Sequence, residues 1–241
     1  MAEFQVPKND PSLSLEEVWP PFGLRIESPR LVLRQVRETD FAGFLAAASS
    51  GIRNTEKCPF LTPWDDNPPE AMARNSLPYI WSQRAKIGPD HWYLMLGVFL
   101  KNDDRSEGLL IGVQDVNARN YRVMRTVNSG SWMRRDHQGQ GLGKEMRAAM
   151  LLWAFDHFNA EYAQSGANSW NKPSQGVSAS LGYQTVGRAR RVGAYGDEAE
   201  EGLYFLLSAD EFNRPDWDIE VTGNELLRDF MLLTNRHLHS S

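Results

Sequence analysis

One short stretch of the sequence combines residue types and a spacing that suit the binding of an anion. Its members are Gln138, Gly139, Gln140, Gly141, Leu142, Gly143 and Lys144. Alternating glycines leave several backbone N–H groups free to converge on one anion, because glycine has no side chain to obstruct them. The apolar spacing after the glycines predicts a helix, whose first turn adds unpaired N–H groups and the positive end of its dipole. The segment therefore predicts a cradle for a phosphate or pyrophosphate.

Two common nucleotide loops fit this segment poorly. A Walker loop would need glycine at Gln138 and serine or threonine at Glu145. A dinucleotide fingerprint needs Gly-x-Gly-x-x-Gly and opens a βαβ unit. The spacing here is Gly-x-Gly-x-Gly, and a β-meander is predicted upstream of it. An enzyme that uses ATP or NAD at this loop therefore remains only a third hypothesis.

Periodicity predicts the elements that must position the loop. The clearest is a helix over 142–158, with apolar residues at helical spacing on one face. The other expected elements are a strand within 24–36, a helix over 40–50 capped by Thr39 and ended by Gly51, a proline-rich loop at 53–69, a helix over 70–86 bent or broken near Pro78, strands at 91–100, 109–116, 125–133 and 160–167, a short helix over 173–181, and a final hairpin of 184–192 with 202–208.

This order of elements predicts the fold class. Strand–helix–strand–helix in the centre, flanked by hairpins, is typical of an α/β (α+β) mixed sheet with helices on both faces. Residues 1–23 are rich in Pro, Asp and Ser and are expected to form an irregular arm. One domain over 24–208 accommodates the rest. Residues 209–241 form a C-terminal extension packed on the same domain, with a docking helix at 225–233.

The spacing Gln138-x-x-Gly141-x-Gly143 resembles the Q/R-x-x-G-x-G/A signature of the GNAT acyltransferase superfamily. Residues 27–34, ESPRLVLR, look like the first strand of that family. The resemblance covers roughly residues 24–207. It implies the GNAT fold, in which two central strands splay apart and the pantetheine arm of coenzyme A enters the gap. It also implies that the cradle holds the pyrophosphate of coenzyme A.

A further block narrows the resemblance to one branch. Asn171-Lys172-Pro173-Ser174, followed by Leu-Gly-Tyr at 181–183, is similar to the RimJ/RimL branch, which acetylates protein N-termini and related amines. Residues 18–24 and 129–132 look like an actinobacterial subgroup in which some members are thought to use succinyl-CoA. The resemblance therefore implies acetyl-CoA or succinyl-CoA as the donor.

The resemblance also assigns roles along the predicted strand 125–133. Ser131, Trp132 and Met133 match the splayed strand whose backbone pairs with pantetheine. A main-chain N–H near Met133 would polarise the thioester carbonyl, and losing one such donor typically costs ~3 kcal/mol. Arg134 and Arg135 either reach phosphates or are ordinary solvated loop arginines.

Two polar residues match the family beyond this strand. Asn171 matches the asparagine that bonds pantetheine or caps the following helix. Ser174 matches the position proposed to protonate the departing thiolate. Its alternative is an ordinary residue in the first helical turn. Little acid catalysis is needed for this step, because the thiolate of a thiol with a pKa of about 8.5 is a fair leaving group.

The general base is where the sequence departs from the branch. A glutamate commonly precedes the strand's isoleucine-glycine there, whereas Asn128 occupies that stretch here. An amide cannot accept the proton. Asp115 and His91, on neighbouring strands, are the candidate substitutes, and a chain of water molecules is a third.

These assignments predict an N-acyltransferase that moves acetyl or succinyl to a primary amine by direct attack in a ternary complex. An acceptor with a low pKa is favoured, since a lysine amine of pKa about 10.4 loses about 4.6 kcal/mol to protonation at pH 7 and an α-amine about 1.4 kcal/mol. The alternative, favoured by Asn128, is a catalytically weak acyl-CoA-binding regulatory protein. The acceptor cleft is expected from residues 52–87, 193–202 and the C-terminal tail, with aromatic walls at Phe60, Trp64, Tyr79 and Trp81.

Composition restricts the partners. A net charge of −5 argues against a nucleic-acid binder. Cys58 is the only cysteine, so neither an intrachain disulfide nor a cysteine-based zinc site is expected, and no metal is needed. The absence of a long apolar run predicts no membrane span and a cytoplasmic location. The acceptor (a protein N-terminus or a small amine) and the oligomeric state, with a homodimer as one candidate, are left open.

Overall fold

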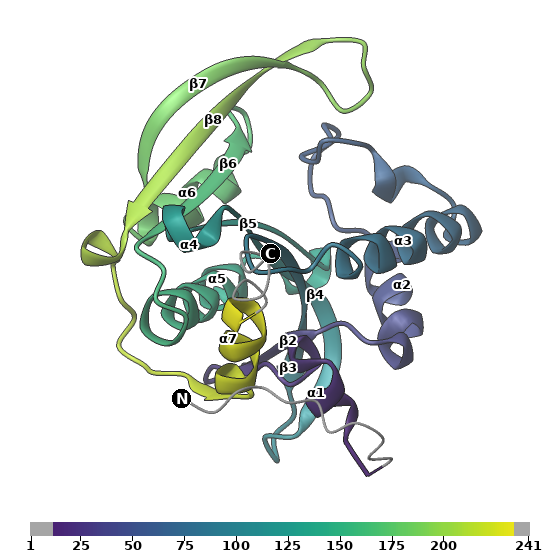
Figure 1. The fold of residues 1–241 in the computed structure, drawn as a ribbon. Helices are drawn as coiled ribbons and strands as arrows, with labels where there is room; N and C mark the ends of the chain where they lie inside the picture. Colours follow the sequence, from purple (N-terminus) through teal and green to yellow (C-terminus); the bar gives the residue numbers. More distant parts are fainter. Residues whose placement is uncertain (1–11, 234–241) are drawn as a thin grey trace, which may run out of the picture.

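Nine strands form one mixed sheet in the computed structural model, which describes residues 12–233 (Figure 1). The strand order is β7-β8-β6-β5-β4-β3-β2-β1-β9. All neighbours are antiparallel except β5 and β6, which are parallel. The strands are β1 (Arg25–Glu27), β2 (Leu31–Gln35), β3 (His91–Lys101), β4 (Glu107–Arg119), β5 (Thr126–Met133), β6 (Tyr162–Asn168), β7 (Gln184–Val192), β8 (Ala199–Ser208) and β9 (Glu220–Thr222).

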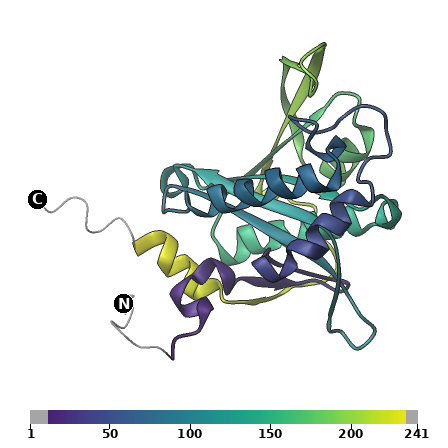
Figure 2. The ribbon, with the colours of Figure 1, turned by 90° about the vertical axis from the view of Figure 1, so that its right-hand side faces the viewer.

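Helices cover both faces of this sheet, as predicted (Figures 1 and 2). Helices α2 and α3 pack on one face around Phe44 and Ile80, and α5 packs on the other within the larger core. The helices are α1 (Leu15–Val18), α2 (Phe41–Ser49), α3 (Pro69–Arg84), α4 (Tyr121–Met124), α5 (Leu142–Leu152), α6 (Lys172–Ser180) and α7 (Asn224–Leu233). The observed mixed α/β sheet confirms the predicted fold class.

Helix α5 follows the glycine loop and is the best-buried helix. Its residues from Glu145 to Leu152 are all buried, and the chain continues as one π-helical turn, Trp153–His157. Trp153 is fully buried. Because this helix is anchored along its length, its N-terminus is held in a fixed place at the end of β5. The prediction of a long helix here is confirmed.

The region predicted as one strand within 24–36 is instead the hairpin β1–β2. Ser28 makes the turn, since its N–H donates to the carbonyl of Leu31 and its Oγ accepts from the N–H of Leu31. The predicted cap of the next helix is also wrong. A 3₁₀ turn, Glu38–Asp40, precedes α2, and Asp40 is the residue before its first turn. The carboxylate of Asp40 accepts the N–H of Arg37 instead of capping α2.

Three other segments differ from expectation. Helix α3, predicted to be bent or broken near Pro78, continues through Pro78 without a break. The expected irregular arm contains α1, capped by Ser14, and a 3₁₀ turn in which Pro20 to Phe22 are buried. Residues 1–11 of that arm lie outside the described residues, as do 234–241 of the extension. Strand β9 was not foreseen and pairs with β1. Within residues 12–233, no helix combines the length and apolar character needed to cross a bilayer.

Candidate active site

Strands β5 and β6 separate after a short stretch of pairing. Their register runs only from Thr126–Tyr162 to Asn128–Gln164. Both strands then continue, β5 to Met133 and β6 to Asn168. Parallel strands that stop pairing while still extended expose backbone groups to a third extended chain. This gap is the splayed centre of the sheet that the family resemblance implies.

The glycine loop stands at the mouth of this gap. Gly139 and Gly141 have φ values of +75° and +80°, in the left-handed region that favours glycine. A Cβ added at Gly139 or Gly143 would meet no atom within 4 Å, so the outer side of the loop is open. Among residues 12–233, the backbone N–H groups of 139–144 have no hydrogen-bond partner. The loop therefore presents a run of unpaired amides at the start of α5, as the sequence predicts.

The side chain of Gln138 supports the loop from within. Its Nε2 donates to the carbonyl oxygen of Met133 at 2.9 Å and to that of Ile52 at 3.0 Å. The N–H of Arg135 donates to the carbonyl of Gly51 nearby. Gln138, expected among the cofactor-binding residues, thus uses its amide nitrogen to join the end of β5 to the segment after α2.

Glu145 holds the inner side of the loop. Its Oε1 accepts from Ser28 Oγ at 2.8 Å and from the N–H of Arg30 at 2.9 Å, and its Oε2 accepts from Arg30 Nε at 2.6 Å. The Glu145 side chain is only 7% exposed. Arg30 also reaches the loop, donating from Nη1 to the carbonyl of Gln140 at 3.2 Å. The β1–β2 turn therefore fixes the cradle against the sheet.

Replacing Glu145 with alanine should loosen this attachment. The Ser28 hydroxyl would lose a buried charge-assisted partner, and such bonds contribute about 1.5–3 kcal/mol each. We expect the unfolding free energy measured in urea to fall by about 2 kcal/mol. The loss stays this small because the half-exposed Arg30 can replace its lost bonds with bonds to water. Glu225→Ala, at an exposed position on α7, is the control. Equal stability of the two variants would contradict the clamp.

Asp115 lies on β4 opposite Gly130 of β5. Its Oδ1 accepts the N–H of Gly130 at 2.9 Å, and a Cβ on Gly130 would lie 2.9 Å from Oδ2, so a larger residue there would displace the Asp115 carboxylate. Burial raises the pKa of Asp115, although hydrogen bonds from Gly130, Tyr93 and Asn117 act in the opposite direction. A carboxylate with a raised pKa is better suited to accept a proton.

The neighbours of Asp115 lie on the face covered by α2 and α3. Trp132 is on this face and packs on Phe44 and Trp64, with ring centroids 5.4 and 5.7 Å apart. Tyr93 contacts the ring of Tyr79 at 6.4 Å. Burial raises the pKa of Tyr93. Asp115 thus sits among aromatic side chains on β4, one strand away from the gap, and bonds to β5, the strand that borders the gap.

Asn128, which stands where the branch has its glutamate, and His91, the other candidate base, are placed differently. Asn128 is exposed and lies opposite Asn117, at the last paired position before the gap. His91 is exposed at the start of β3, opposite Arg119. Since Asp115 pairs with Met95, His91 is four residues away along the strand, which is about 13 Å.

Asn171 and Ser174 lie at the first turn of α6, just beyond the end of β6. Asn171 Oδ1 accepts the N–H of Ser174 at 3.3 Å and caps the helix. Asn171 therefore caps the following helix, which is one of the two roles that the resemblance implies. Ser174 is partly exposed at the same end of the gap as Asn171.

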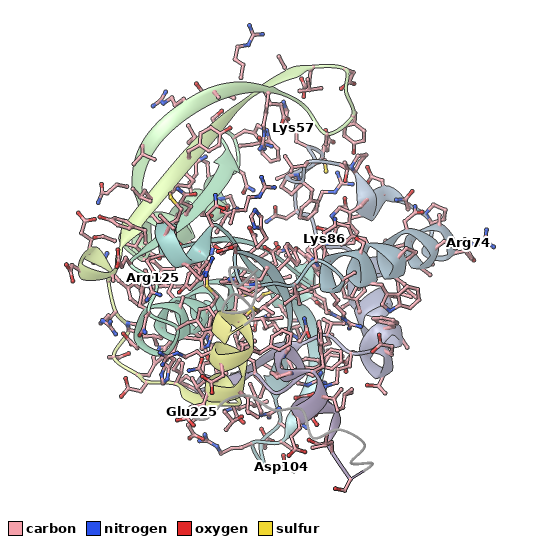
Figure 3. The ribbon with its side chains drawn as sticks, viewed as in Figure 1. Lys57, Arg74, Lys86, Asp104, Arg125 and Glu225 are labelled. Atoms are coloured by element: carbon pink, nitrogen blue, oxygen red, sulfur yellow. The ribbon has the colours of Figure 1, made fainter. Side chains whose placement is uncertain are left out.

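The tip of the β7–β8 hairpin meets the proline-rich loop between α2 and α3. Arg53 Nη1 donates to Tyr195 Oη at 3.2 Å, and the Tyr195 hydroxyl also bonds Asp66. Lys57 pairs with Glu198 at 3.3 Å, and Figure 3 shows Lys57 beside the hairpin. Two of the segments predicted to frame the acceptor cleft are thus brought together. The described part of the C-terminal extension packs elsewhere, since β9 pairs with β1 at the other edge of the sheet.

Arg147 was missed by the sequence reasoning. It is 4% exposed on α5, and its guanidinium donates to hydroxyls on both sides of the gap. The available signal was its position, because it is the only charged residue between Glu145 and Asp156 in an apolar helix. Tyr93 was missed as well, since one aromatic residue in an apolar strand carries no distinguishing pattern.

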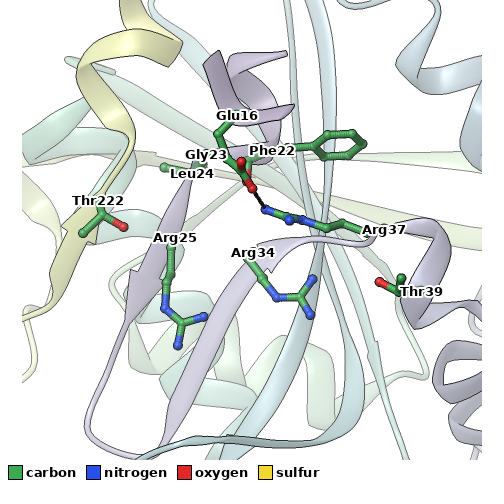
Figure 4. A pocket seen from close by; sticks show the side chains of 9 residues that line it. All are labelled: Glu16, Phe22, Gly23, Leu24, Arg25, Arg34, Arg37, Thr39 and Thr222. Carbon is green, nitrogen blue, oxygen red and sulfur yellow. Dashed lines mark hydrogen bonds and ion pairs between the residues drawn. The ribbon is translucent and has the colours of Figure 1, made fainter. Parts of the chain in front are cut away.

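A cavity of about 400 Å³ lies away from the gap and belongs to a different set of residues (Figure 4). Three arginines line it, and each is paired with a carboxylate. Arg34 pairs with Asp40 at 2.7 Å and Arg37 with Glu16 at 2.6 Å. Arg25 pairs with Glu107 at 2.7 Å. Because each of these charges is paired, we interpret the lining of this cavity as an ion-pair network that joins α1 to the β1–β2 hairpin.

Comparison with known proteins agrees with this geometry. A family model described as "Acetyltransferase (GNAT) domain" matches residues 30–184. The fold is similar to that of Mycobacterium smegmatis RimJ in complex with CoA-disulfide, at 17% identity over 85% of this chain and 91% of that chain, with a TM-score of 0.60. It is also similar to RimL, a ribosomal alpha-N-protein acetyltransferase solved with coenzyme A, at 15% identity over 76% and 97% of the two chains, with a TM-score of 0.61.

A GNAT-family acetyltransferase from Bacillus anthracis shares the fold at 16% identity, over 78% of this chain and 99% of that chain, with a TM-score of 0.58. At these identities the structural likeness concerns the fold. The family model, in contrast, spans more than half of the sequence, including the glycine loop and the start of α6. The chain belongs to the GNAT acetyltransferase family, and acyl transfer from coenzyme A is the chemistry of its site.

Proposed function

We propose that this protein is an N-acyltransferase that moves an acetyl or succinyl group from coenzyme A to a primary amine by direct attack in a ternary complex. The observation that carries the proposal is the run of unpaired amides at 139–144, which opens onto the gap between β5 and β6. A pyrophosphate at those amides would direct the attached pantetheine arm into the gap. Asp115 accepts the N–H of Gly130 on β5, the strand that borders this gap.

In this proposal each part of the donor has its own partners. The amides of Gly139 to Lys144 bind the pyrophosphate, where charge-assisted hydrogen bonds are strongest. The backbone of Ser131 to Met133 pairs with pantetheine, and Asn171 contacts it from α6. A main-chain N–H near Met133 stabilises the oxyanion that forms on the thioester carbonyl.

The reaction then needs one proton acceptor and one leaving group. Asp115 accepts a proton from the ammonium of the acceptor, directly or through one water. The neutral amine attacks the thioester carbon, so that a C–N bond forms and the C–S bond breaks. The electron pair leaves on sulfur as coenzyme A thiolate, and Ser174 helps to protonate it.

The acceptor would enter on the face covered by α2 and α3, where the aromatic residues around Trp64 and Tyr79 lie. The hairpin tip at Tyr195 joins the proline-rich loop above this face. An entrance between these two segments would suit the end of a polypeptide or a small amine, and a protein N-terminus is our first candidate. We assign residues 24–208 to the catalytic domain and 209–241 to a C-terminal extension, whose described part, 209–233, packs on that domain.

The experiment is release of free thiol from acetyl-CoA and succinyl-CoA in the presence of a panel of amines. The panel contains short peptides with a free α-amine, the same peptides blocked at the N-terminus but carrying lysine, and small amines. Amine-dependent thiol release with a new amide detected by mass spectrometry would support the proposal. Tight coenzyme A binding with no transfer to any amine would identify a regulatory acyl-CoA-binding protein instead.

A further inference from the structure

Arg147 places a positive charge beneath the gap between β5 and β6. The residue is 4% exposed and lies in the middle of α5. Its Nη2 donates to Ser131 Oγ on β5 at 3.2 Å, and its Nη1 donates to Ser165 Oγ on β6 at 3.3 Å. Nη1 also donates to Ser178 Oγ on α6 at 3.1 Å. The guanidinium therefore spans the two strands at the point where they have separated.

This charge has no acidic partner in contact. Among residues 12–233, no carboxylate lies within salt-bridge distance of Arg147, and its buried Nε has no hydrogen-bond partner. The ionisable groups whose charge acts on it are Tyr183 and Asp115, and burial lowers the pKa of Arg147. Buried charges in proteins are normally paired, so an unpaired guanidinium indicates that an anion is supplied from outside.

The three serines add to this preference for an anion. Each hydroxyl accepts a hydrogen bond from the guanidinium, so each keeps its own O–H to donate. Ser131 is partly exposed and belongs to the stretch of β5 that would face pantetheine. A negative group at the end of the gap would thus find both a cation and several hydroxyl donors.

The identity of that anion follows from what an acyl-CoA carries at its reactive end. The pyrophosphate is held at the glycine loop, and a thioester with a simple alkyl chain is neutral. Within the donor, a permanent negative charge near the thioester can only be a carboxylate on the acyl chain. We propose that Arg147, with Ser131 and Ser165, forms a subsite for the terminal carboxylate of a short dicarboxylic acyl group, so that the preferred donor is an ω-carboxyacyl-CoA. This inference rests on the proposed function and selects between its two donors.

The test compares two donors with acyl chains of equal length, succinyl-CoA and butyryl-CoA, by calorimetry on the full-length protein without an amine. Coenzyme A alone is titrated as the reference. We expect wild-type protein to bind succinyl-CoA at least about tenfold more tightly than butyryl-CoA, the size of one charge-assisted hydrogen bond. This comparison requires no variant.

Substitutions then assign the preference to Arg147. Arg147→Met, which keeps the volume and removes the charge, should bind both donors equally and coenzyme A normally. Arg147→Lys, which keeps the charge but loses the planar fork, should retain part of the preference. The matched control is Arg214→Met, since Arg214 pairs with Asp156 on the surface and should leave the ratio unchanged.

The outcomes separate the two proposals. Equal affinity of wild-type protein for succinyl-CoA and butyryl-CoA would overturn the carboxylate subsite while leaving the acyltransferase proposal standing. A preference for succinyl-CoA that survives in Arg147→Met would assign it to another residue and overturn the role of Arg147. A lack of affinity for coenzyme A itself would remove the proposed function first, and this inference with it.

Discussion

Gly143→Glu is expected to lower the affinity for coenzyme A by about 100-fold or more. Gly143 is the second residue of α5, and a Cβ there meets no protein atom within 4 Å. A glutamate would extend into the space that the pyrophosphate is proposed to fill and would add a like charge. Losing two charge-assisted hydrogen bonds of about 1.5 kcal/mol each already accounts for about 100-fold. Calorimetry with coenzyme A measures the effect.

The matched control for this prediction is Gly176→Glu. Gly176 is also a helical glycine with open space around its Cα, but it lies on the exposed side of α6. Folding should survive at both positions, because a Cβ at either one meets no atom within 4 Å and glutamate is a better helix former than glycine. Coenzyme A binding by Gly143→Glu at wild-type strength would refute the cradle, whatever the activity of the protein.

Asp115→Asn is expected to lower kcat by about 100-fold or more, with little change in coenzyme A affinity. A positioned general base typically contributes a factor of about 10²–10⁴. Asparagine is similar in shape and can keep a bond to the N–H of Gly130 through its Oδ1, so the sheet should remain intact. Steady-state kinetics with the best amine of the panel measures the change. An unaltered kcat would leave a chain of water molecules as the proton acceptor.

The pH dependence gives this prediction a second readout. The rate requires the deprotonated carboxylate, and burial raises the pKa of Asp115 above its ordinary value of 3.8. In wild-type protein, kcat/KM should therefore fall as pH decreases through that raised pKa, at a higher pH than for an exposed aspartate. Asp115→Asn should lose this acidic limb. A profile with the same limb in the variant would assign it to another group.

As the pH rises, the contribution of Asp115 to folding stability should decrease while the rate increases. Because the pKa of Asp115 is raised in the folded state, its contribution to stability is present below the unfolded pKa of about 3.9 and is lost as pH rises through the folded pKa. Asparagine does not titrate. Relative to wild type, the variant should gain thermal stability as pH increases from about 4, which differential scanning calorimetry can follow. A loss of stability across this range would mean that the charged form is favoured by its hydrogen bonds.

The glycine loop and its helix were predictable because their signals are local. Alternating glycines before an amphipathic run specify a tight loop and a helix start whatever the rest of the chain does. Gly139 and Gly141 indeed adopt positive φ values, and α5 begins at Leu142. The predicted hairpins β3–β4 and β7–β8 were found for the same reason, since hairpins join neighbouring segments of the chain.

The contacts that support the loop were not predictable, because they join segments far apart in the sequence. Glu145 meets Ser28 and Arg30 of the first hairpin, and Gln138 meets Ile52. A glutamate in the first turn of a helix looks in sequence like an ordinary favourable charge. Only packing of β1–β2 against α5 turns it into a buried clamp.

The sequence by itself determined the mixed α/β class, the anion-binding loop and the family, since each depends on local spacing of residue types. The tertiary structure alone decided which polar residues share one site. It separates His91 from the gap, bonds Asp115 to the strand that borders the gap and places Arg147 beneath the gap. The physical reason is that strand register and helix packing are set by burial of the whole core, and a one-residue change of register would exchange the faces on which these side chains lie.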